Sequence, residues 1–332
     1  MESISDKIKI LIADPLHNDA ISLLKSSGFS VTRNEKKPKR DLIKLLGSYH
    51  AIICRTATKI DKNFFIAAKN LKCIGLASTG YDHIDIEEAS RRGVYVLGLP
   101  PENSKINVYK NGNFISTAEH TILLILAASR NFHQAVCSMR EGRWEKNSLL
   151  GNEIHGKTLG IVGFGRIGKL VSQRALGLGM KILAHDPYLS REHASMHNAK
   201  LVSLATLCKK ADVITIHAPQ TPQTIGLIDE KCFGLMTHGV IIINAARASI
   251  IDEDALLANI KNGKVKSAAV DVFKNEPLEE LTEITALPNV FATPHIGGST
   301  EEALRRISMD TAKNVTAYLK YGRKKNAINK IS

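Results

Sequence analysis

The sequence is short of several features that define whole classes of protein. No apolar run is long enough to cross a bilayer, since the most apolar stretch covers only residues 122–128. Residues 1–7 contain no apolar segment of the kind found in a secretory signal peptide. We therefore expect a protein without a membrane partner and with a cytoplasmic location.

Cysteines and aromatic residues are also scarce. The 332 residues include five cysteines and one tryptophan, and aromatic residues make up 5% of the chain. The cysteines, at positions 54, 73, 137, 208 and 232, are odd in number and lack the spacing of a metal site. This pattern argues against a disulfide framework, and it predicts free thiols and no bound metal.

The net formal charge of +13 would suit a nucleic-acid-binding protein, but the basic residues are spread along the chain. The two dense clusters, residues 36–40 and 323–325, have no interleaved aromatic residues. We therefore expect a solvated basic surface and no nucleic-acid partner, although a basic cleft that attracts small anions would also fit.

The strongest motif of the chain is a glycine-rich turn, Gly163-x-Gly165-x-x-Gly168. It follows a short apolar strand and precedes an amphipathic helix. In a dinucleotide-binding fold the first glycine permits a tight turn, the second lets the backbone approach a pyrophosphate, and the third lets the helix pack on its strand. A purely structural glycine turn is the alternative, since this motif alone is weak.

A carboxylate at the end of the next strand favours the dinucleotide interpretation. Residues 181–185 form an apolar strand that ends in Asp186, where an acidic residue would accept hydrogen bonds from an adenine ribose. That carboxylate would repel a 2′-phosphate, and Pro187 and Tyr188 provide no arginine to hold one. The predicted cofactor is therefore NAD rather than NADP.

Apolar strands alternate with helices along the chain, which predicts α/β architecture with parallel sheets covered on both faces. We expect two doubly wound domains with a cleft between them: a flavodoxin-like substrate-binding domain (residues 1–104 and 299–332) and a Rossmann-type NAD-binding domain (residues 105–298). The irregular stretch 98–114 is interpreted as the hinge. The expected strands are 8–13, 29–32, 51–54, 74–76, 94–97, 161–162, 181–185, 213–217, 240–244, 268–270 and 290–292.

Side-chain type predicts where the helices begin. Asn18 and Ser116 are expected to cap the helices that follow them, and residues 299–302 form a capping box that opens a helix running towards Leu319. The polar tail from Lys320 is expected to fray.

Four polar residues follow predicted strands of the second domain: Arg247, Asp271, Glu276 and His295. Each alone could be a surface or structural residue, but their concentration at one sheet edge favours catalysis. Arginine provides a permanent cation for a substrate carboxylate, and histidine is the best proton donor to an alkoxide near neutral pH. A carboxylate behind the histidine would orient the ring, and Asp271 would accept from the nicotinamide carboxamide.

These motifs resemble the D-isomer-specific 2-hydroxyacid dehydrogenases over nearly the whole chain. The matching stretches are residues 163–168 with Asp186, 244–247, 271–277 and 293–300. The resemblance implies Arg247, Glu276 and His295 as the catalytic set and a homodimer held through the cofactor domain. The implied substrate contacts are Arg55, Thr79, Gly80, Asn113, Arg247 and His295. The implied cofactor contacts are Thr79, Gly163, Gly165, Arg166, Ile167, Gly168, Asp186, His217, Ala218, Pro219, Ala245, Arg247, Asp271, His295, Gly297 and Gly298.

Within the family, residues 139–160 and 112–119 resemble members that oxidise 3-phospho-D-glycerate in serine biosynthesis. Departures at His83, Phe114 and Ala248, and an apparent insertion at 101–111, keep reduction of glyoxylate or hydroxypyruvate open. A non-catalytic, NAD-sensing corepressor is the alternative from another class. No regulatory module follows the last predicted helix, so we expect no feedback inhibition by serine.

Overall fold

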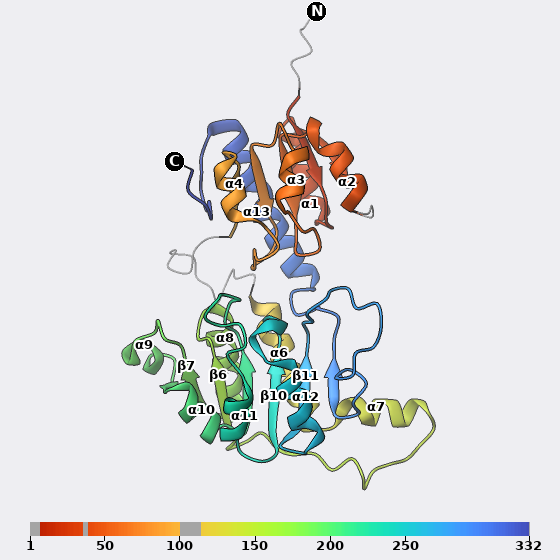
Figure 1. Ribbon diagram of the computed structural model, residues 1–332, viewed down its shortest axis with the longest axis vertical. Helices are drawn as coiled ribbons and strands as arrows, with labels where there is room; N and C mark the ends of the chain where they lie inside the picture. Colours follow the sequence, from red (N-terminus) through yellow and green to blue (C-terminus); the bar gives the residue numbers. More distant parts are fainter. Residues whose placement is uncertain (1–6, 36–38, 100–113, 332) are drawn as a thin grey trace, which may run out of the picture. The chain divides into compact units, whose positions relative to one another are not determined.

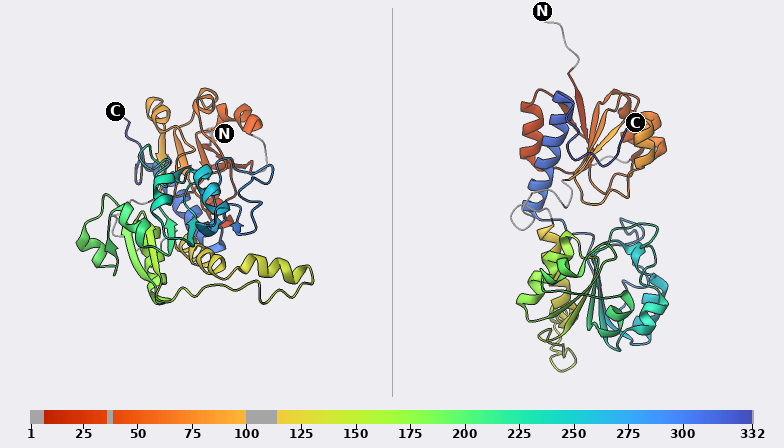
Figure 2. Two further views of the ribbon diagram at one scale, coloured as in Figure 1. Left: turned by 60° about the horizontal axis from the view of Figure 1, so that its bottom comes forward. Right: turned by 90° about the vertical axis from the view of Figure 1, so that its left-hand side faces the viewer.

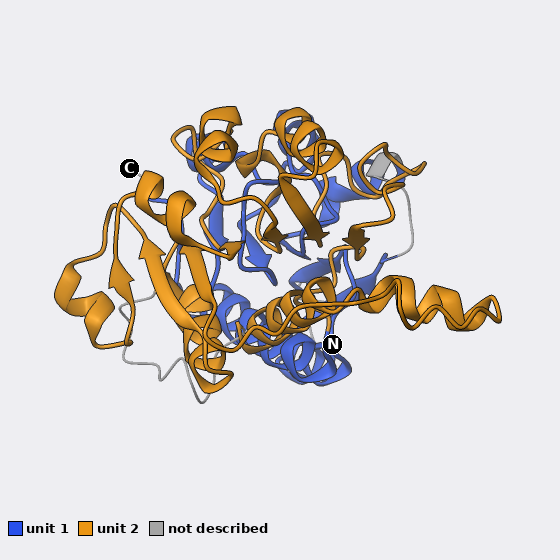
Figure 3. Ribbon diagram, turned by 90° about the horizontal axis from the view of Figure 1, so that it is seen from below, with its two compact units in different colours: residues 1–113, 300–332 blue, residues 114–299 orange. Residues whose placement is uncertain are grey.

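The computed structural model describes residues 7–35, 39–99 and 114–331, and it divides the chain into two compact units. The first unit holds residues 1–113 and 300–332, and the second holds residues 114–299 (Figure 3). Residues 100–113 lie outside the described part of the chain. They include most of the expected hinge (98–114), the expected first boundary at 104/105 and the whole of the insertion at 101–111. The first unit is thus discontinuous in sequence, because its last helix comes after the whole of the second unit.

Among the described residues, the first unit contains a five-stranded parallel sheet. Its strands are β1 (Lys9–Ile12), β2 (Ser30–Arg33), β3 (Ala51–Cys54), β4 (Cys73–Leu76) and β5 (Tyr95–Leu97). The spatial order is β2-β1-β3-β4-β5. This is the flavodoxin-like order, so the fold predicted for the first domain is confirmed.

Helices cover both faces of this sheet (Figure 2). On one face are α1 (Asn18–Ser26) and α13 (Glu301–Tyr321), and on the other are α2 (Lys39–Leu45), the 3₁₀ turn η1 (Leu46–Ser48), α3 (Lys62–Ala67) and α4 (Ile86–Arg91). Alternate residues of each strand therefore enter different cores. In β1, for example, Leu11 packs with Phe64, whereas Ile12 packs in the core formed with Leu24.

The second unit contains, among the described residues, a seven-stranded parallel sheet (Figure 1). Its strands are β6 (Thr158–Val162), β7 (Lys181–His185), β8 (Lys200–Leu201), β9 (Val213–Ile216), β10 (Val240–Asn244), β11 (Val265–Val270) and β12 (Val290–Ala292). The spatial order is β12-β11-β10-β9-β6-β7-β8. Since β6, the first strand, lies between β7 and β9, this is the Rossmann order with its switch point at β6, as predicted.

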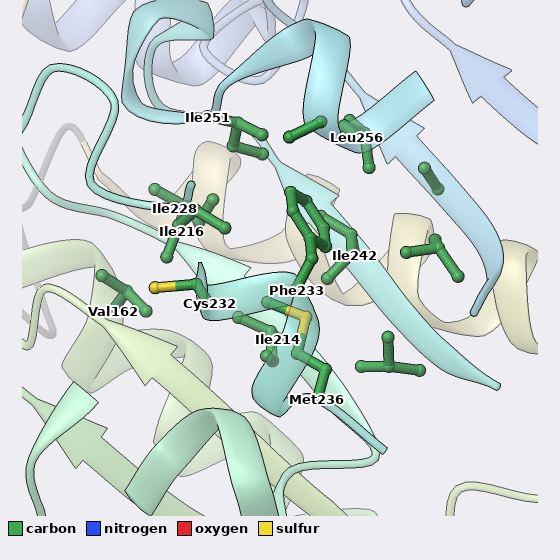
Figure 4. Packing of buried hydrophobic residues seen from close by; sticks show 14 of the residues in the cluster. Val162, Ile214, Ile216, Ile228, Cys232, Phe233, Met236, Ile242, Ile251 and Leu256 are labelled. Atoms are coloured by element: carbon green, nitrogen blue, oxygen red, sulfur yellow. The ribbon is translucent and has the colours of Figure 1, made fainter. Parts of the chain in front are cut away.

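The helices of the second unit also form two layers. One face of the sheet carries α6 (Ile115–Ser129) and α8 (Arg166–Gly177), and the other carries α10 (Leu204–Lys210), α11 (Glu230–Leu235) and α12 (Glu253–Lys261). The second face buries the core shown in Figure 4, where Phe233 lies among Ile242, Leu256 and Met236. The remaining elements are α7 (Phe132–Arg140), α9 (Arg191–Ser195) and the 3₁₀ turn η2 (Ala248–Ile250).

Several element ends differ from the predictions. The N-cap of α1 is His17, whose Nδ1 accepts from the Asp19 N–H, and not Asn18. The N-cap of α6 is Phe114, without a side-chain hydrogen bond, and not Ser116. The N-cap of α13 is Thr300, whose hydroxyl accepts from the Ala303 N–H at 3.2 Å, so the predicted capping box of residues 299–302 is displaced by one residue and its Glu302 does not take part. Local preference thus located the helices better than it identified their caps.

The prediction of a frayed tail is wrong. Helix α13 continues to Tyr321, and the residues after it return to the edge strand β5. The side-chain amide of Asn329 is buried, accepting from the Val96 N–H at 2.8 Å and donating to the Val94 carbonyl at 2.9 Å. The tail therefore satisfies backbone groups that an exposed sheet edge would leave open. No helix within the described residues combines the length and apolar content needed to cross a membrane.

Candidate active site

The glycine turn adopts the geometry that its sequence predicts. Gly163 has a φ of +88°, and a Cβ atom there would lie 2.5 Å from the Ala218 backbone nitrogen. A Cβ atom on Gly168 would lie 2.4 Å from the Gly163 carbonyl oxygen. Helix α8 then begins after Gly165 without a side-chain cap. The turn is thus packed too closely for side chains, and the start of α8 presents backbone N–H groups, the usual partners of a pyrophosphate.

Asp186 lies beside this turn, at the end of β7. Its carboxylate accepts hydrogen bonds from the backbone N–H groups of Phe164 and Tyr188, both at 3.0 Å. The side chain is partly exposed, and its position beside the glycine turn is the one expected of a ribose acceptor. Arg166 and Ile167, also predicted to contact the cofactor, form the first turn of α8.

The loop after β9 supplies the neighbouring part of the predicted cofactor site, residues 217–219. Burial lowers the pKa of His217 to about 3, so its imidazole is neutral. The ring bonds through Nε2 to the Thr215 hydroxyl at 3.0 Å, whereas Nδ1 is buried and has no protein partner among the described residues. A buried nitrogen in that state is suited to a ligand group.

Arg247 follows β10, and a buried asparagine shapes the turn that carries it. The Asn244 side chain is 2% exposed. It accepts from the Ala246 N–H at 3.1 Å and donates to the Arg247 carbonyl at 3.0 Å. Strand β10 thus ends in an Asn-stabilised turn that contains the buried Ala245 and places the half-buried Arg247 just beyond the sheet edge.

Glu276 and His295 come from loops 19 residues apart and meet directly. His295 Nδ1 lies 2.5 Å from Glu276 Oε2, and the other Glu276 oxygen accepts from the Phe273 N–H at 2.8 Å. The two side chains are 32% and 33% exposed, so solvent reaches the pair. Burial alone would raise the pKa of Glu276, but the hydrogen bonds from His295 and Phe273, with the charges of His295 and Arg247, outweigh it and leave that pKa lowered.

Asp271 behaves differently from the other strand-end residues. Its side chain is 1% exposed, and its oxygens accept from the Thr293 hydroxyl at 2.6 Å and from the Ile296 and Gly297 N–H groups, both at 2.8 Å. Burial alone would raise its pKa, but these donors and His120 outweigh it and leave the pKa lowered. The predicted contact with the nicotinamide carboxamide stays a prediction, whereas the contacts with the protein are explicit.

The predicted substrate residues of the first unit lie after its parallel strands. Arg55 follows β3, and Asp14, after β1, accepts from the Arg55 N–H at 2.5 Å and from the Thr58 hydroxyl at 2.9 Å. Thr79 and Gly80 follow β4, and Asn113 lies outside the described residues. The loop that carries Arg55 is therefore fixed by a buried carboxylate.

Sequence reasoning missed two residues that shape these sites. Asp14 follows a predicted strand, as the selected residues do, and that position was the available signal. His120 stands in the apolar helix α6, where a lone histidine is ordinarily a packed core residue, and yet its Nε2 lies 3.1 Å from the Thr293 hydroxyl. Pro219 and Gly298, both predicted cofactor contacts, are exposed in the loops after β9 and β12.

Residues 122–297 match the family model described as the D-isomer specific 2-hydroxyacid dehydrogenase, NAD binding domain. The chain belongs to the D-isomer-specific 2-hydroxyacid dehydrogenases. The family and the NAD cofactor of its binding domain were both predicted from the motifs, and both are confirmed.

Individual members of the dehydrogenase family show how far the similarity extends. The chain is 42% identical to a D-3-phosphoglycerate dehydrogenase of Archaeoglobus fulgidus over 97% of this chain and 59% of that enzyme. It is 38% identical to a hydroxypyruvate reductase of Thermotoga maritima over 93% of this chain and 97% of that enzyme. The NAD⁺-bound 3-phosphoglycerate dehydrogenase of Entamoeba histolytica superposes with a TM-score of 0.80 and 27% identity, over 98% and 100% of the two chains. The chain thus spans about 59% of the length of the first of these relatives.

Proposed function

We propose that this chain oxidises 3-phospho-D-glycerate to 3-phosphohydroxypyruvate with NAD, a reaction of serine biosynthesis, and that Arg247, Glu276 and His295 are its catalytic residues. The observation that carries the proposal is the 2.5 Å contact between His295 and Glu276 on the unit that bears the glycine turn. The choice of substrate is supported by 42% identity to a D-3-phosphoglycerate dehydrogenase over 97% of the chain.

His295 is the proton-transfer group of the proposal. Because Nδ1 faces the Glu276 carboxylate, the ring hydrogen lies on Nδ1 and Nε2 is an acceptor. Nε2 then takes the hydroxyl proton of the hydroxy acid during oxidation, and the imidazolium returns it to the carbonyl oxygen during reduction. Ionised Glu276 stabilises the imidazolium that forms, and it fixes the ring orientation.

The second unit fits NAD by two features of its own residues. Close packing at Gly163 and Gly168 excludes side chains from the turn, and the buried His217 Nδ1 has no protein partner in the described part of the chain. The glycine turn and the start of α8 would hold the pyrophosphate, and Asp186 the adenine ribose. When bound, NAD accepts the hydride that leaves the hydroxylated carbon of the substrate.

Two arginines suit an acid with a second anionic group. Arg247 provides planar donors for a substrate carboxylate. Burial lowers the pKa of Arg55, although the charge of Asp14 opposes this effect. A partly desolvated guanidinium gains from an anionic partner, so we assign Arg55 to the substrate phosphate.

Reduction of hydroxypyruvate is the second candidate, and one observation favours it. The chain is 38% identical to the Thermotoga maritima hydroxypyruvate reductase over 93% of its length, which is close to its identity to the phosphoglycerate dehydrogenases. The two candidates share the catalytic residues and differ in whether a phosphate is bound.

Steady-state assays with NADH as the reductant separate the two candidates. We expect kcat/KM for phosphohydroxypyruvate to exceed that for hydroxypyruvate and for glyoxylate by about tenfold or more, the effect of one charge-assisted contact. An Arg55→Gln variant should lose most of this preference while retaining turnover of hydroxypyruvate. A higher kcat/KM for hydroxypyruvate in the natural protein would overturn the choice of substrate.

The arm of the second unit supports the homodimer that the family resemblance implies. Helix α7 and the segment after it extend away from the body of this unit (Figure 1). Their exposed apolar side chains include Met139 (58%), Trp144 (80%) and Leu150 (83%). We propose that a second copy of the cofactor unit covers them, because large apolar side chains at this exposure favour burial. Analytical ultracentrifugation should show a dimer for the natural protein and a monomer for the double variant Trp144→Ser, Leu150→Ser. A monomeric natural protein would refute this assembly.

A further inference from the structure

His120 lies on the sheet-facing side of α6 and reaches the loop that carries His295. Its side chain is 10% exposed, and Nε2 lies 3.1 Å from the Thr293 hydroxyl and 3.4 Å from Asp271 Oδ1. Thr293 Oγ1 in turn lies 2.6 Å from the same Asp271 oxygen. Three side chains, from α6, from the loop after β11 and from the loop after β12, thus form one connected polar cluster.

The hydrogens of this cluster can be assigned from its partners. Asp271 is ionised, so it accepts, and the Thr293 hydroxyl must donate to it. The Thr293 oxygen is then an acceptor towards His120, which requires a hydrogen on Nε2. His120 is therefore the donor at the start of a chain of hydrogen bonds that ends on the Asp271 carboxylate.

Asp271 holds the His295 loop from both sides. Thr293 lies before His295, and the Ile296 and Gly297 N–H groups lie after it; all three donate to the carboxylate. Between these anchors His295 has a φ of +52°, in the left-handed region that a histidine seldom adopts. The anchors therefore maintain a backbone conformation that costs free energy and that directs the ring to Glu276.

Helix α6 packs directly against this loop. A Cβ atom on Gly297 would lie 3.0 Å from Asp271 Oδ2, 3.4 Å from Thr117 Cγ2 and 3.6 Å from His120 Cδ2. A displacement of His120 would therefore be transmitted to Asp271 and Gly297 by contact as well as by the loss of a hydrogen bond.

We propose that His120 is a positioning residue for His295: its Nε2–H holds Thr293 and Asp271 in the arrangement that keeps the His295 ring in register with Glu276. This inference rests on the proposed dehydrogenase function for its kinetic consequence, but not for its structural one. His120 touches neither Glu276 nor His295 in any contact described above, so its effect passes through the loop.

The test compares two replacements of His120. His120→Phe keeps a ring of similar size and removes the donor, whereas His120→Gln places an amide N–H near the original Nε2. We expect His120→Phe to lower kcat about tenfold, the rate equivalent of one hydrogen bond, with the Kd for NADH within about twofold of the natural value. His120→Gln should recover most of kcat. Equal loss in both variants, or no loss in either, would overturn the proposal.

A second measurement does not depend on turnover. In ¹⁵N-labelled protein without cofactor, the His295 Nδ1–H resonance, assigned by its loss in His295→Gln, should be present in the natural protein and in His120→Gln. It should be broadened or absent in His120→Phe. An unaltered resonance in His120→Phe would refute the positioning role, whether or not the protein turns over a 2-keto acid. Absence of turnover in the natural protein would count against the proposed function alone.

Thr293 provides matched variants in case His120→Phe does not fold. Thr293→Val keeps the shape and removes the hydroxyl, and Thr293→Ser keeps the hydroxyl. We expect Thr293→Val to reproduce the lower kcat and the altered His295 resonance, and Thr293→Ser to restore both. Natural behaviour in Thr293→Val would contradict the connected chain of hydrogen bonds.

Discussion

Replacing Glu276 by glutamine removes a charge from the proposed catalytic pair with little change of shape. The amide oxygen of the variant can still accept from the Phe273 N–H, which lies 2.8 Å from Oε1 in the natural protein. The contact with His295, 2.5 Å in the natural protein, would lose its charge. Glu276→Gln thus tests the charge of the pair rather than the packing of its loop.

The expected effect follows from the strength and exposure of this contact. A hydrogen bond to a charged group contributes about 1.5–3 kcal/mol. Because the two side chains are 32% and 33% exposed, solvent screening favours the lower half of that range, about 1.5–2 kcal/mol. The imidazolium that forms in the transition state loses this stabilisation, so kcat should fall about 10- to 30-fold. KM for NADH should change little, because Glu276 is not one of the predicted cofactor contacts.

The lowered pKa of Glu276 sets the pH range in which its charge contributes. The pKa of Glu276 is lowered, so its stabilising contribution is present above the ordinary carboxyl pKa of 4.5 and is lost as the pH falls through the lowered value. Above pH 4.5 the natural protein should therefore keep the full contribution of the Glu276 charge, and Glu276→Gln should lack it at every pH.

The assay is kcat for reduction of phosphohydroxypyruvate between pH 5 and 9, with saturating NADH. The matched control is Glu283→Gln, which neutralises a side chain that is 65% exposed and pairs with Lys261 on the same unit. The control should retain the natural rate and profile. If Glu276→Gln kept kcat within about twofold of the natural value across this pH range, the proposed role of the pair would be refuted.

Three further variants test other parts of the second unit. Arg247→Lys should lower kcat/KM for the keto acid about 100-fold, mostly through KM, because an ammonium cannot form the bidentate contact; a change under threefold would exclude Arg247 as the substrate anchor. Gly168→Ala should weaken NADH binding and lower the free energy of unfolding by about 1–3 kcal/mol, since its Cβ would lie 2.4 Å from a backbone oxygen; calorimetry and NADH titration measure both. Without cofactor, the free energy of unfolding of the natural protein should fall by up to about 1.4 kcal/mol per pH unit below pH 6.5, because His217 is protonated in the unfolded chain while its pKa in the folded chain is about 3. Urea titrations at several pH values should show a smaller slope for His217→Asn. An identical slope in the variant would contradict a buried, neutral imidazole at His217.

Much of the architecture could be predicted because strongly apolar strands alternate with helices. Strands β7, β10 and β12 begin and end where the sequence indicates them. Strand β11 begins at Val265 rather than at the predicted Ala268. The prediction missed its first residues because Lys266 and Ser267 interrupt the apolar run. Ser267 is nevertheless buried, and its hydroxyl donates to the Asn289 carbonyl at 2.9 Å. A polar residue satisfied by a distant backbone group leaves no local signal.

The same limit applies to the tail and to the site. Asn329 pairs with Val96, 233 residues earlier in the chain, so composition alone made the tail resemble a frayed end. His120 and Asp271 are 151 positions apart, yet they contact one residue, Thr293. The sequence predicted which residue types carry the chemistry, whereas the residues that hold them in place depend on contacts that only the folded chain defines.

The order of the strands explains how predicted site residues that are more than a hundred positions apart in the sequence can lie around one cofactor. Because β6 lies between β7 and β9, the glycine turn has Asp186 on one side and His217 on the other. Strands β10, β11 and β12 follow β9 on the His217 side of the glycine turn. Arg247, after β10, and His295, after β12, therefore lie on the side of the turn away from Asp186. In the proposed site, the residue assigned to the ribose therefore lies at β7 and the residue assigned to proton transfer lies at β12. Glu276 and His295 follow the neighbouring strands β11 and β12, and because such strands lie about 4.8 Å apart, their loops can bring the two side chains into contact.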